Sequence, residues 1–106
     1  MKKQLFALAL AAAIPFSAGA EVKVGVITGA TGPGASLGIP YKNTFSVVPD
    51  TLGGEPVRYV IVDDATDTTT AVKLARKLIE EDKVDLIIGS SSVPAAIAVA
   101  EVASEL

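Results

Sequence analysis

The sequence predicts an α/β fold in which a βαβαβα segment forms a parallel sheet. Three apolar runs rich in β-branched residues predict strands at residues 22–28, 57–62 and 84–89. A loop and then a helical pattern follow each run, and strands that alternate with helices in this way form parallel sheets with right-handed crossovers. Ligands of such sheets bind at the carboxyl ends of the strands, so the loops after the three runs are the candidate functional edge.

The first 20 residues have the organisation of a secretory signal peptide. Two lysines precede an apolar run from Leu5 to Phe16, and the small residues Ala18-Gly19-Ala20 follow it. The run has about 12 residues and a membrane-spanning helix needs roughly 20, so it is too short to span a membrane. A short buried helix is the alternative, but the polar switch after Ala20 argues against it. We expect cleavage after Ala20 and no membrane insertion of the mature segment, residues 21–106.

Composition narrows the possible functions of this segment. Of the chain's 9 Lys and Arg, two lie in the predicted signal peptide, so 9 − 2 = 7 face 12 Asp and Glu, a net charge of −5. This acidity disfavours nucleic acid and anionic membrane surfaces as partners. The sequence has no Cys and no His, which excludes disulfides, cysteine or histidine metal sites and His-dependent catalytic constellations. We expect neither a cofactor nor a metal.

The loop after the first predicted strand, residues 29–38, holds four of the nine glycines. Its T-G-A-T-G start is similar to the NAD-binding loop of short-chain dehydrogenases. Against an enzyme of that kind, Pro33 removes an amide donor, and the strand-end acid Asp63 lies about 30 residues beyond the loop where about 20 is usual. A short helix from about 38 to 48 should follow, ended by Pro49.

The second predicted strand lies between a turn cluster, Leu52 to Pro56, and a pair of aspartates. Asp67 then stands where an N-cap belongs, ahead of a helix with one apolar face from Ala71 to Asp82. On its polar face we expect i,i+4 ion pairs, Arg76 with Glu80 and Lys77 with Glu81. A metal site at Asp63, Asp64 and Asp67 is a weaker interpretation, because no Gly-punctuated coordination loop accompanies these carboxylates.

The serine loop, Ser90-Ser91-Ser92, joins the third predicted strand to an Ala-rich helix from Pro94 onward. At a helix N-terminus the first N–H groups lack partners and the helix dipole favours negative charge. Hydroxyls beside those amides make a site suited to a carboxylate. The alternative is that Ser92 only caps the helix and its neighbours are solvated, although a cap and a ligand can share one helix end.

Four pieces of the mature sequence occur in an order typical of one family. They are Val24-Gly25-Val26-Ile27 leading into Thr31-Gly32-Pro33 and Ala35-Ser36-Leu37-Gly38; Gly53-Gly54; Asp63-Asp64-Ala65-Thr66-Asp67 before Ala71-Val72; and Ile87-Ile88-Gly89 before the serines. In this order and spacing, residues 22–106 resemble the type I periplasmic solute-binding proteins of branched-chain amino acid ABC transporters, the leucine/isoleucine/valine-binding family.

The resemblance implies a fold and a site. In this family two α/β lobes close over a small ligand, and residues 21–106 would be the N-terminal part of the first lobe, truncated. The ligand carboxylate would be held by Ser91 and Ser92, with Ser90 adjacent, and by amides at the helix N-terminus. Leu37, with Gly38 beside it, would lie over the ligand. Branched-chain amino acid binders often have an aromatic residue there, so Leu37 leaves room for an aromatic acid or another carboxylate.

The resemblance also implies partners and a location. The ligand would be a small carboxylate such as an amino acid or an aromatic acid, and the protein partner would be the membrane permease of an ABC importer. The protein would be periplasmic and would not be an enzyme. A sensory or regulatory ligand-binding domain on the same fold is the alternative, and a signalling domain downstream would favour it.

Overall fold

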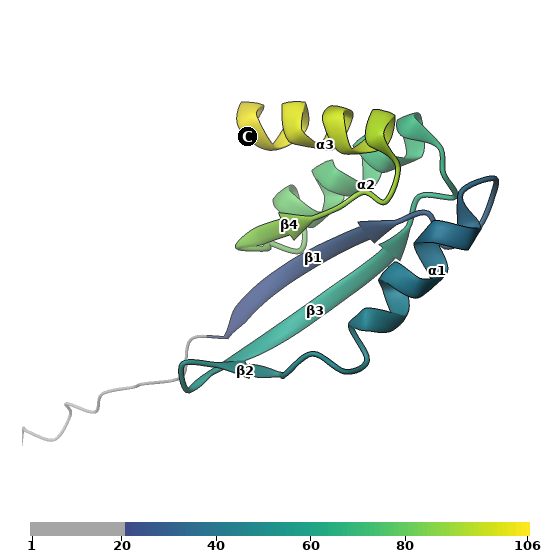
Figure 1. The fold of residues 1–106 in the computed structure, drawn as a ribbon. Coiled ribbons are helices and arrows are strands. Elements are labelled where there is room, and N and C mark those ends of the chain that lie inside the picture. Colours follow the sequence, from purple (N-terminus) through teal and green to yellow (C-terminus); the bar gives the residue numbers. More distant parts are fainter. Residues whose placement is uncertain (1–20) are drawn as a thin grey trace, which may run out of the picture.

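The computed structural model describes residues 21–106 as a sheet with helices on both faces (Figure 1). The predicted signal peptide, residues 1–20, lies outside the described residues. The strands are β1 (Val22–Thr28), β2 (Thr51–Leu52), β3 (Glu55–Asp63) and β4 (Leu86–Ile88), and the helices are α1 (Ala35–Thr44), α2 (Thr68–Glu80) and α3 (Val93–Glu105).

The sheet has the order β2-β3-β1-β4. β1 pairs in parallel with β3, where Val26 lies opposite Ile61, and with β4, where Val26 lies opposite Ile88. Each parallel connection passes through a helix, as β-α-β units require. The predicted α/β architecture with a mostly parallel sheet is therefore confirmed.

One edge of the sheet differs from the prediction. The segment interpreted as a turn cluster contains β2, which pairs antiparallel with the start of β3. Gly53 and Gly54 form the two-residue connection, with φ angles of 57° and 86°. Hairpins of this length need positive φ at both central residues, which glycine adopts without steric cost. The sheet is thus mixed, and β3 begins two residues earlier than predicted.

α1 begins earlier than predicted, whereas α2 begins where its predicted N-cap places it. α1 starts at Ala35, not near residue 38, because the amides of Ala35 and Gly38 bond back to the carbonyls of Gly32 and Gly34. α2 starts at Thr68, directly after Asp67, whose side chain accepts a hydrogen bond of 2.7 Å from the Thr70 amide. The predicted N-cap is therefore confirmed.

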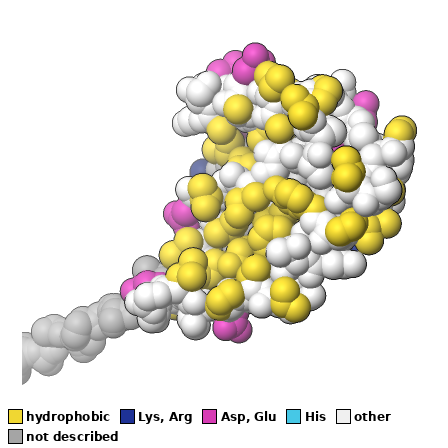
Figure 2. All heavy atoms as spheres, in the orientation of Figure 1, with side chains coloured by type: hydrophobic (Ala, Val, Ile, Leu, Met, Phe, Trp, Pro, Cys, Tyr) yellow, Lys and Arg dark blue, Asp and Glu magenta, His cyan; other side chains and the backbone are white. Residues whose placement is uncertain are grey.

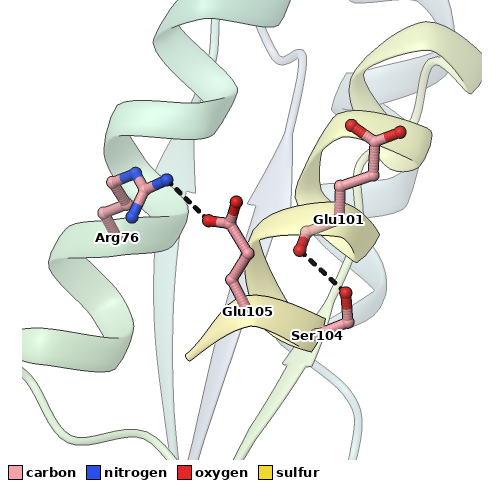
Figure 3. A network of polar contacts seen from close by, with 4 residues as sticks. All are labelled: Arg76, Glu101, Ser104 and Glu105. Carbon is pink, nitrogen blue, oxygen red and sulfur yellow. Dashed lines mark hydrogen bonds and ion pairs between the residues drawn. The ribbon is translucent and has the colours of Figure 1, made fainter.

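The prediction of ion pairs within α2, Arg76 with Glu80 and Lys77 with Glu81, is wrong. Arg76 instead reaches the last turn of α3, where its Nη2 lies 2.8 Å from Glu105 Oε2, and Figure 3 shows the two side chains pointing toward each other between the helices. In the same turn of α3 the Ser104 hydroxyl donates to the Glu101 carbonyl. Lys77 pairs with Asp82, at 3.3 Å. Packing of α3 beside α2 offers Arg76 a partner that a one-helix pattern cannot indicate.

Two apolar clusters hold the layers together. On one face, Ile27 of β1 packs among buried residues of α2 and α3, including Ala75, Leu78 and Val99. On the other face, Val24 and Val26 pack with Val57 of β3 and with partly buried aromatic residues, Tyr41, Phe45 and Tyr59. Successive β1 side chains alternate between the two clusters, as a strand covered on both sides requires.

The surface retains exposed apolar side chains, which gather over part of the face shown in Figure 2. A groove of about 430 Å³ lies between the ends of α2, β4 and α3, and apart from Asp85 its lining is apolar: Ile79, Val84, Leu86, Ile87, Ala103 and Leu106. It lies at the amino end of β4, the opposite end of the strands from the serine loop. Among residues 21–106, no helix has both the length and the apolar character needed to cross a membrane.

Candidate functional site

The three loops at the carboxyl ends of the parallel strands meet around the end of β1. The Gly29 amide donates a hydrogen bond of 2.9 Å to the Ser91 hydroxyl oxygen. The Thr28 hydroxyl donates to the Gly38 carbonyl at 3.0 Å, and its oxygen lies 3.4 Å from Ser91 Oγ. The structure thus brings Ser91 of the serine loop and Gly38 of α1 together at the Thr28 hydroxyl.

Asp64 fixes the neighbouring residue of the serine loop. This carboxylate is fully buried, and it accepts hydrogen bonds from the Thr66 amide at 2.8 Å and from the Ser90 hydroxyl at 2.6 Å. A buried carboxylate needs such donors to offset the loss of hydration. Asp64, which follows β3, therefore ties the loop after that strand to the loop after β4.

Asp63 holds the Gly-rich loop in the same way. Its carboxylate accepts hydrogen bonds from the amides of Ala30, Thr31 and Ala65 and from the Thr31 hydroxyl. Partial burial acts to raise the pKa of Asp63, but these hydrogen bonds outweigh it and hold the pKa below its usual value. The charged form of Asp63 is therefore part of the loop structure.

The loop after β3 has an unusual backbone. Ala65 and Thr66 have positive φ angles, 53° and 63°, although neither is glycine. The carboxylates of Asp63 and Asp64 each accept a bond from one of these two amides, which stabilises the conformation. The Thr66 hydroxyl then bonds the Gly-rich loop, donating to the Thr31 carbonyl at 2.8 Å and accepting from the Gly34 amide.

Gly38 is buried because α1 approaches the Gly29 backbone closely. A Cβ atom at this position would lie 1.9 Å from the Gly29 carbonyl oxygen, so only glycine fits. Gly38 therefore offers the site its backbone alone, and its carbonyl already accepts from Thr28. The side chain of Leu37, the preceding residue, is 67% exposed at the start of α1.

Ser92 occupies the N-cap position of α3, but its side chain makes no capping hydrogen bond. Pro94 in the first turn has no N–H, so the first-turn amides are those of Val93 and Ala95. All three serines of the loop are partly exposed. The loop therefore presents hydroxyls at its surface beside the exposed first residue of the helix, Val93, and hydroxyls at a helix N-terminus are donors suited to a carboxylate.

The sequence did not indicate that Thr28 belongs to the site, and it indicated only a weak metal-site role for Asp64. Thr28 reads as the last residue of an apolar strand, yet strand alternation puts it on the α1 face together with Val24 and Val26. That alternation was the available signal. The Asp64–Ser90 bond joins residues 26 positions apart, and no local pattern indicates it.

The three aspartates that the sequence offered as a weak metal site have other partners. Asp63 and Asp64 bind loop amides and hydroxyls, and Asp67 caps α2. Within residues 21–106, no group of three or more His, Cys, Asp or Glu side chains is arranged to hold a metal ion.

Comparison with known proteins relates this architecture to one family. The family model described as periplasmic binding protein matches residues 21–105. An amino acid binding protein of Pseudomonas aeruginosa is 32% identical over 89% of this chain and 28% of its own length.

Solved structures give the same result. An extracellular ligand-binding receptor from Rhodopseudomonas palustris HaA2 is 42% identical over 81% of this chain, with a TM-score of 0.79. The solute binding protein of an ABC transporter from R. palustris BisB5, in complex with 3,4-dihydroxybenzoic acid, is 35% identical over 80% of this chain, with a TM-score of 0.75. This chain spans 24% of each of those two chains.

Proposed function

The chain belongs to the periplasmic binding protein family, and from this premise we propose that it captures a small carboxylate ligand for an ABC importer. The family and the fold are those of binding proteins, which supports a ligand-binding role. The ligand class, the importer and the periplasmic location are the proposed parts.

The junction of Ser91 with the Gly29 amide is the observation that carries the proposal. The contact joins the loop after β1 to the loop after β4, at the edge where parallel sheets bind ligands. Beside it lie Ser92, whose hydroxyl makes no cap bond, and the first-turn amides of α3. We assign Ser91, Ser92 and the Val93 amide to the ligand carboxylate.

The ligands of relatives support two candidate classes. The P. aeruginosa relative is named as an amino acid binding protein, and the R. palustris BisB5 protein binds 3,4-dihydroxybenzoic acid. Both ligand classes carry a carboxylate. The exposed Leu37 is assigned to the other end of the ligand, where an aliphatic side chain can cover either an aliphatic or an aromatic group.

Export follows from the predicted signal peptide. We propose that the chain is cleaved after Ala20 and works in the periplasm beside a membrane permease. N-terminal sequencing of the periplasmic protein should begin at Glu21, and an intact Met1 on cytoplasmic protein would contradict the location.

Titration calorimetry on the complete gene product, with any sequence that follows Leu106, tests the ligand site. L-leucine and 3,4-dihydroxybenzoate are the probes. Charge-assisted hydrogen bonds contribute about 1.5–3 kcal/mol, so Ser91→Ala and Ser92→Ala should each weaken binding roughly ten- to a hundredfold. The Val93 amide remains, so binding should fall without vanishing.

The apo melting temperature separates ligand binding from a structural role. Unchanged affinity with a lowered melting temperature would mean that the serines serve only the fold, and the site assignment would be wrong. Uptake of the bound probe by cells with and without the gene tests the importer. Binding without any effect on uptake would favour a sensory domain instead.

A further inference from the structure

Thr28 connects two parts of the proposed site although no ligand contact is assigned to it. The side chain is fully buried at the carboxyl end of β1. Its hydroxyl reaches the first turn of α1, through the Gly38 carbonyl at 3.0 Å, and the serine loop, through Ser91 Oγ at 3.4 Å. A polar group at such a position influences both neighbours at once.

The hydrogens around Thr28 can be assigned by counting donors. The Thr28 hydroxyl donates to the Gly38 carbonyl at 3.0 Å and lies, as a second and weaker donor, 3.4 Å from Ser91 Oγ. The Ser91 oxygen also accepts from the Gly29 amide. Two donors therefore face the Ser91 oxygen, and the proton of Ser91 is left for another acceptor.

The distances rank the two donors. At 3.4 Å the Thr28–Ser91 contact is longer than the 2.5–3.0 Å of a typical O–H···O hydrogen bond, so the Gly29 amide at 2.9 Å is the main donor to the Ser91 oxygen and Thr28 adds to it. Because both groups face the oxygen, the Ser91 hydroxyl is oriented as a donor.

The Ser90 hydroxyl, in contrast, donates its proton into the protein. Its partner is the carboxylate of Asp64, which only accepts, so the Ser90 proton is directed inward at 2.6 Å. Ser90 cannot give that proton to a ligand without leaving a buried carboxylate short of a donor. Its role is to anchor the loop, and the outward donor is Ser91.

We propose that Thr28 is a positioning residue, whose hydroxyl sets the Ser91 hydroxyl as a donor to the ligand carboxylate. The proposal rests on the proposed function, because it needs a carboxylate at Ser91. It assigns to the end of β1 a part in ligand affinity that is separate from its part in the core.

The test compares hydroxyl and non-hydroxyl variants in the complete gene product. Thr28→Val keeps the shape of the side chain and removes the hydroxyl, whereas Thr28→Ser keeps the hydroxyl. Thr44→Val is the matched control, since its hydroxyl also bonds a carbonyl, that of Pro40, on the surface of α1. Thr28→Val should weaken binding of the carboxylate probe about tenfold, and the other two variants should stay within about threefold.

Comparing a carboxylate with its amide distinguishes the proposed positioning role of Thr28 from a purely structural one. Each carboxylate probe is paired with its amide, L-leucinamide or 3,4-dihydroxybenzamide. Since hydrogen bonds to a charged acceptor are the stronger ones, Thr28→Val should lower the carboxylate-to-amide affinity ratio. In the double variant with Ser91→Ala, the loss should equal that of Ser91→Ala alone, because Thr28 acts on the ligand only through the Ser91 hydroxyl.

Four outcomes would overturn the proposal. Equal losses for carboxylate and amide, or losses that multiply in the double variant, would make Thr28 a residue of the fold only. If Ser91→Ala weakens binding but Thr28→Val does not, Thr28 has no positioning role, and the proposed function still stands. If Ser91→Ala leaves binding unchanged, both the role of Thr28 and the proposed carboxylate site are wrong, since the carboxylate would then lie elsewhere.

Discussion

Gly38 offers a test in which the structure predicts the opposite sign from helix propensity. Replacing glycine by alanine inside a helix usually stabilises a protein by about 0.5–1 kcal/mol. Gly38 lies within α1, so propensity alone predicts that Gly38→Ala raises the free energy of unfolding. The surroundings of Gly38 predict that it falls.

The added Cβ would meet backbone atoms that cannot rotate away. It would lie 1.9 Å from the Gly29 carbonyl oxygen, 2.3 Å from the Gly29 carbonyl carbon and 2.8 Å from the Ala30 nitrogen. Non-bonded heavy atoms pack at about 3.5–4.0 Å, so α1 must move away from the loop. Overpacking of this kind costs about 1–3 kcal/mol. Contacts this short with backbone atoms place the cost near the upper end of that range, and subtracting the propensity gain leaves a net loss of about 2 kcal/mol.

Urea unfolding of the wild type, Gly38→Ala and Ser36→Ala measures the effect. Ser36 lies in the same helix and is exposed, so its replacement by alanine should leave stability unchanged or slightly raised. Movement of α1 should also stretch the Thr28–Gly38 hydrogen bond and weaken ligand binding in Gly38→Ala. A Gly38→Ala variant as stable as the wild type, with unchanged affinity, would refute the close approach of α1 to the loop.

Three further changes test individual contacts by denaturation. Because the pKa of Asp63 is lowered in the folded state, its contribution to stability is present above about pH 4 and is lost as the pH falls through the folded pKa. Asp63→Asn should therefore be less stable than the wild type at pH 6, and the difference in unfolding free energy should be smaller at pH 3. A difference that stays constant between the two pH values would contradict this. Lys83 has a φ of 56° after the end of α2, so Lys83→Gly should raise the free energy of unfolding by about 1 kcal/mol, and a decrease would contradict the left-handed conformation. The Arg76–Glu105 pair is exposed, so Glu105→Gln should cost about 0.2–1 kcal/mol and less in high salt, and a larger or salt-independent loss would show that the pair does more than a surface ion pair.

The order of strands and helices was predictable because each element carries its own local signal. β-branched runs mark the strands, and the apolar spacing of α2 marks a helix whose N-cap, Asp67, stands at the expected place. The boundaries were less predictable where tertiary packing overrides local preference. Gly38 lies inside α1 because the close approach to Gly29 needs a glycine, although in sequence it belongs to a Gly-rich loop.

The candidate site was predictable only in part, for a related reason. Hydroxyls before a helix N-terminus are visible in the sequence, so Ser90, Ser91 and Ser92 could be named as a group. Their separate roles depend on partners from distant loops, since Asp64 orients Ser90 and Gly29 orients Ser91. Sequence spacing shows which groups are present, whereas the polarity of each hydrogen bond comes from the assembled edge.

Hydrogen-bond polarity also explains how an anion can bind beside two aspartates. Asp63 accepts from three amides and a hydroxyl, and Asp64 accepts from the Thr66 amide and from Ser90, so both charges are directed into the loops that they hold. Ser91 and the Val93 amide of α3 remain as the donors for a ligand. These few donors suit one carboxylate group, while a second negative charge would meet the aspartates without gaining new partners. The arrangement therefore favours a monocarboxylate over a dianion as the ligand of this edge.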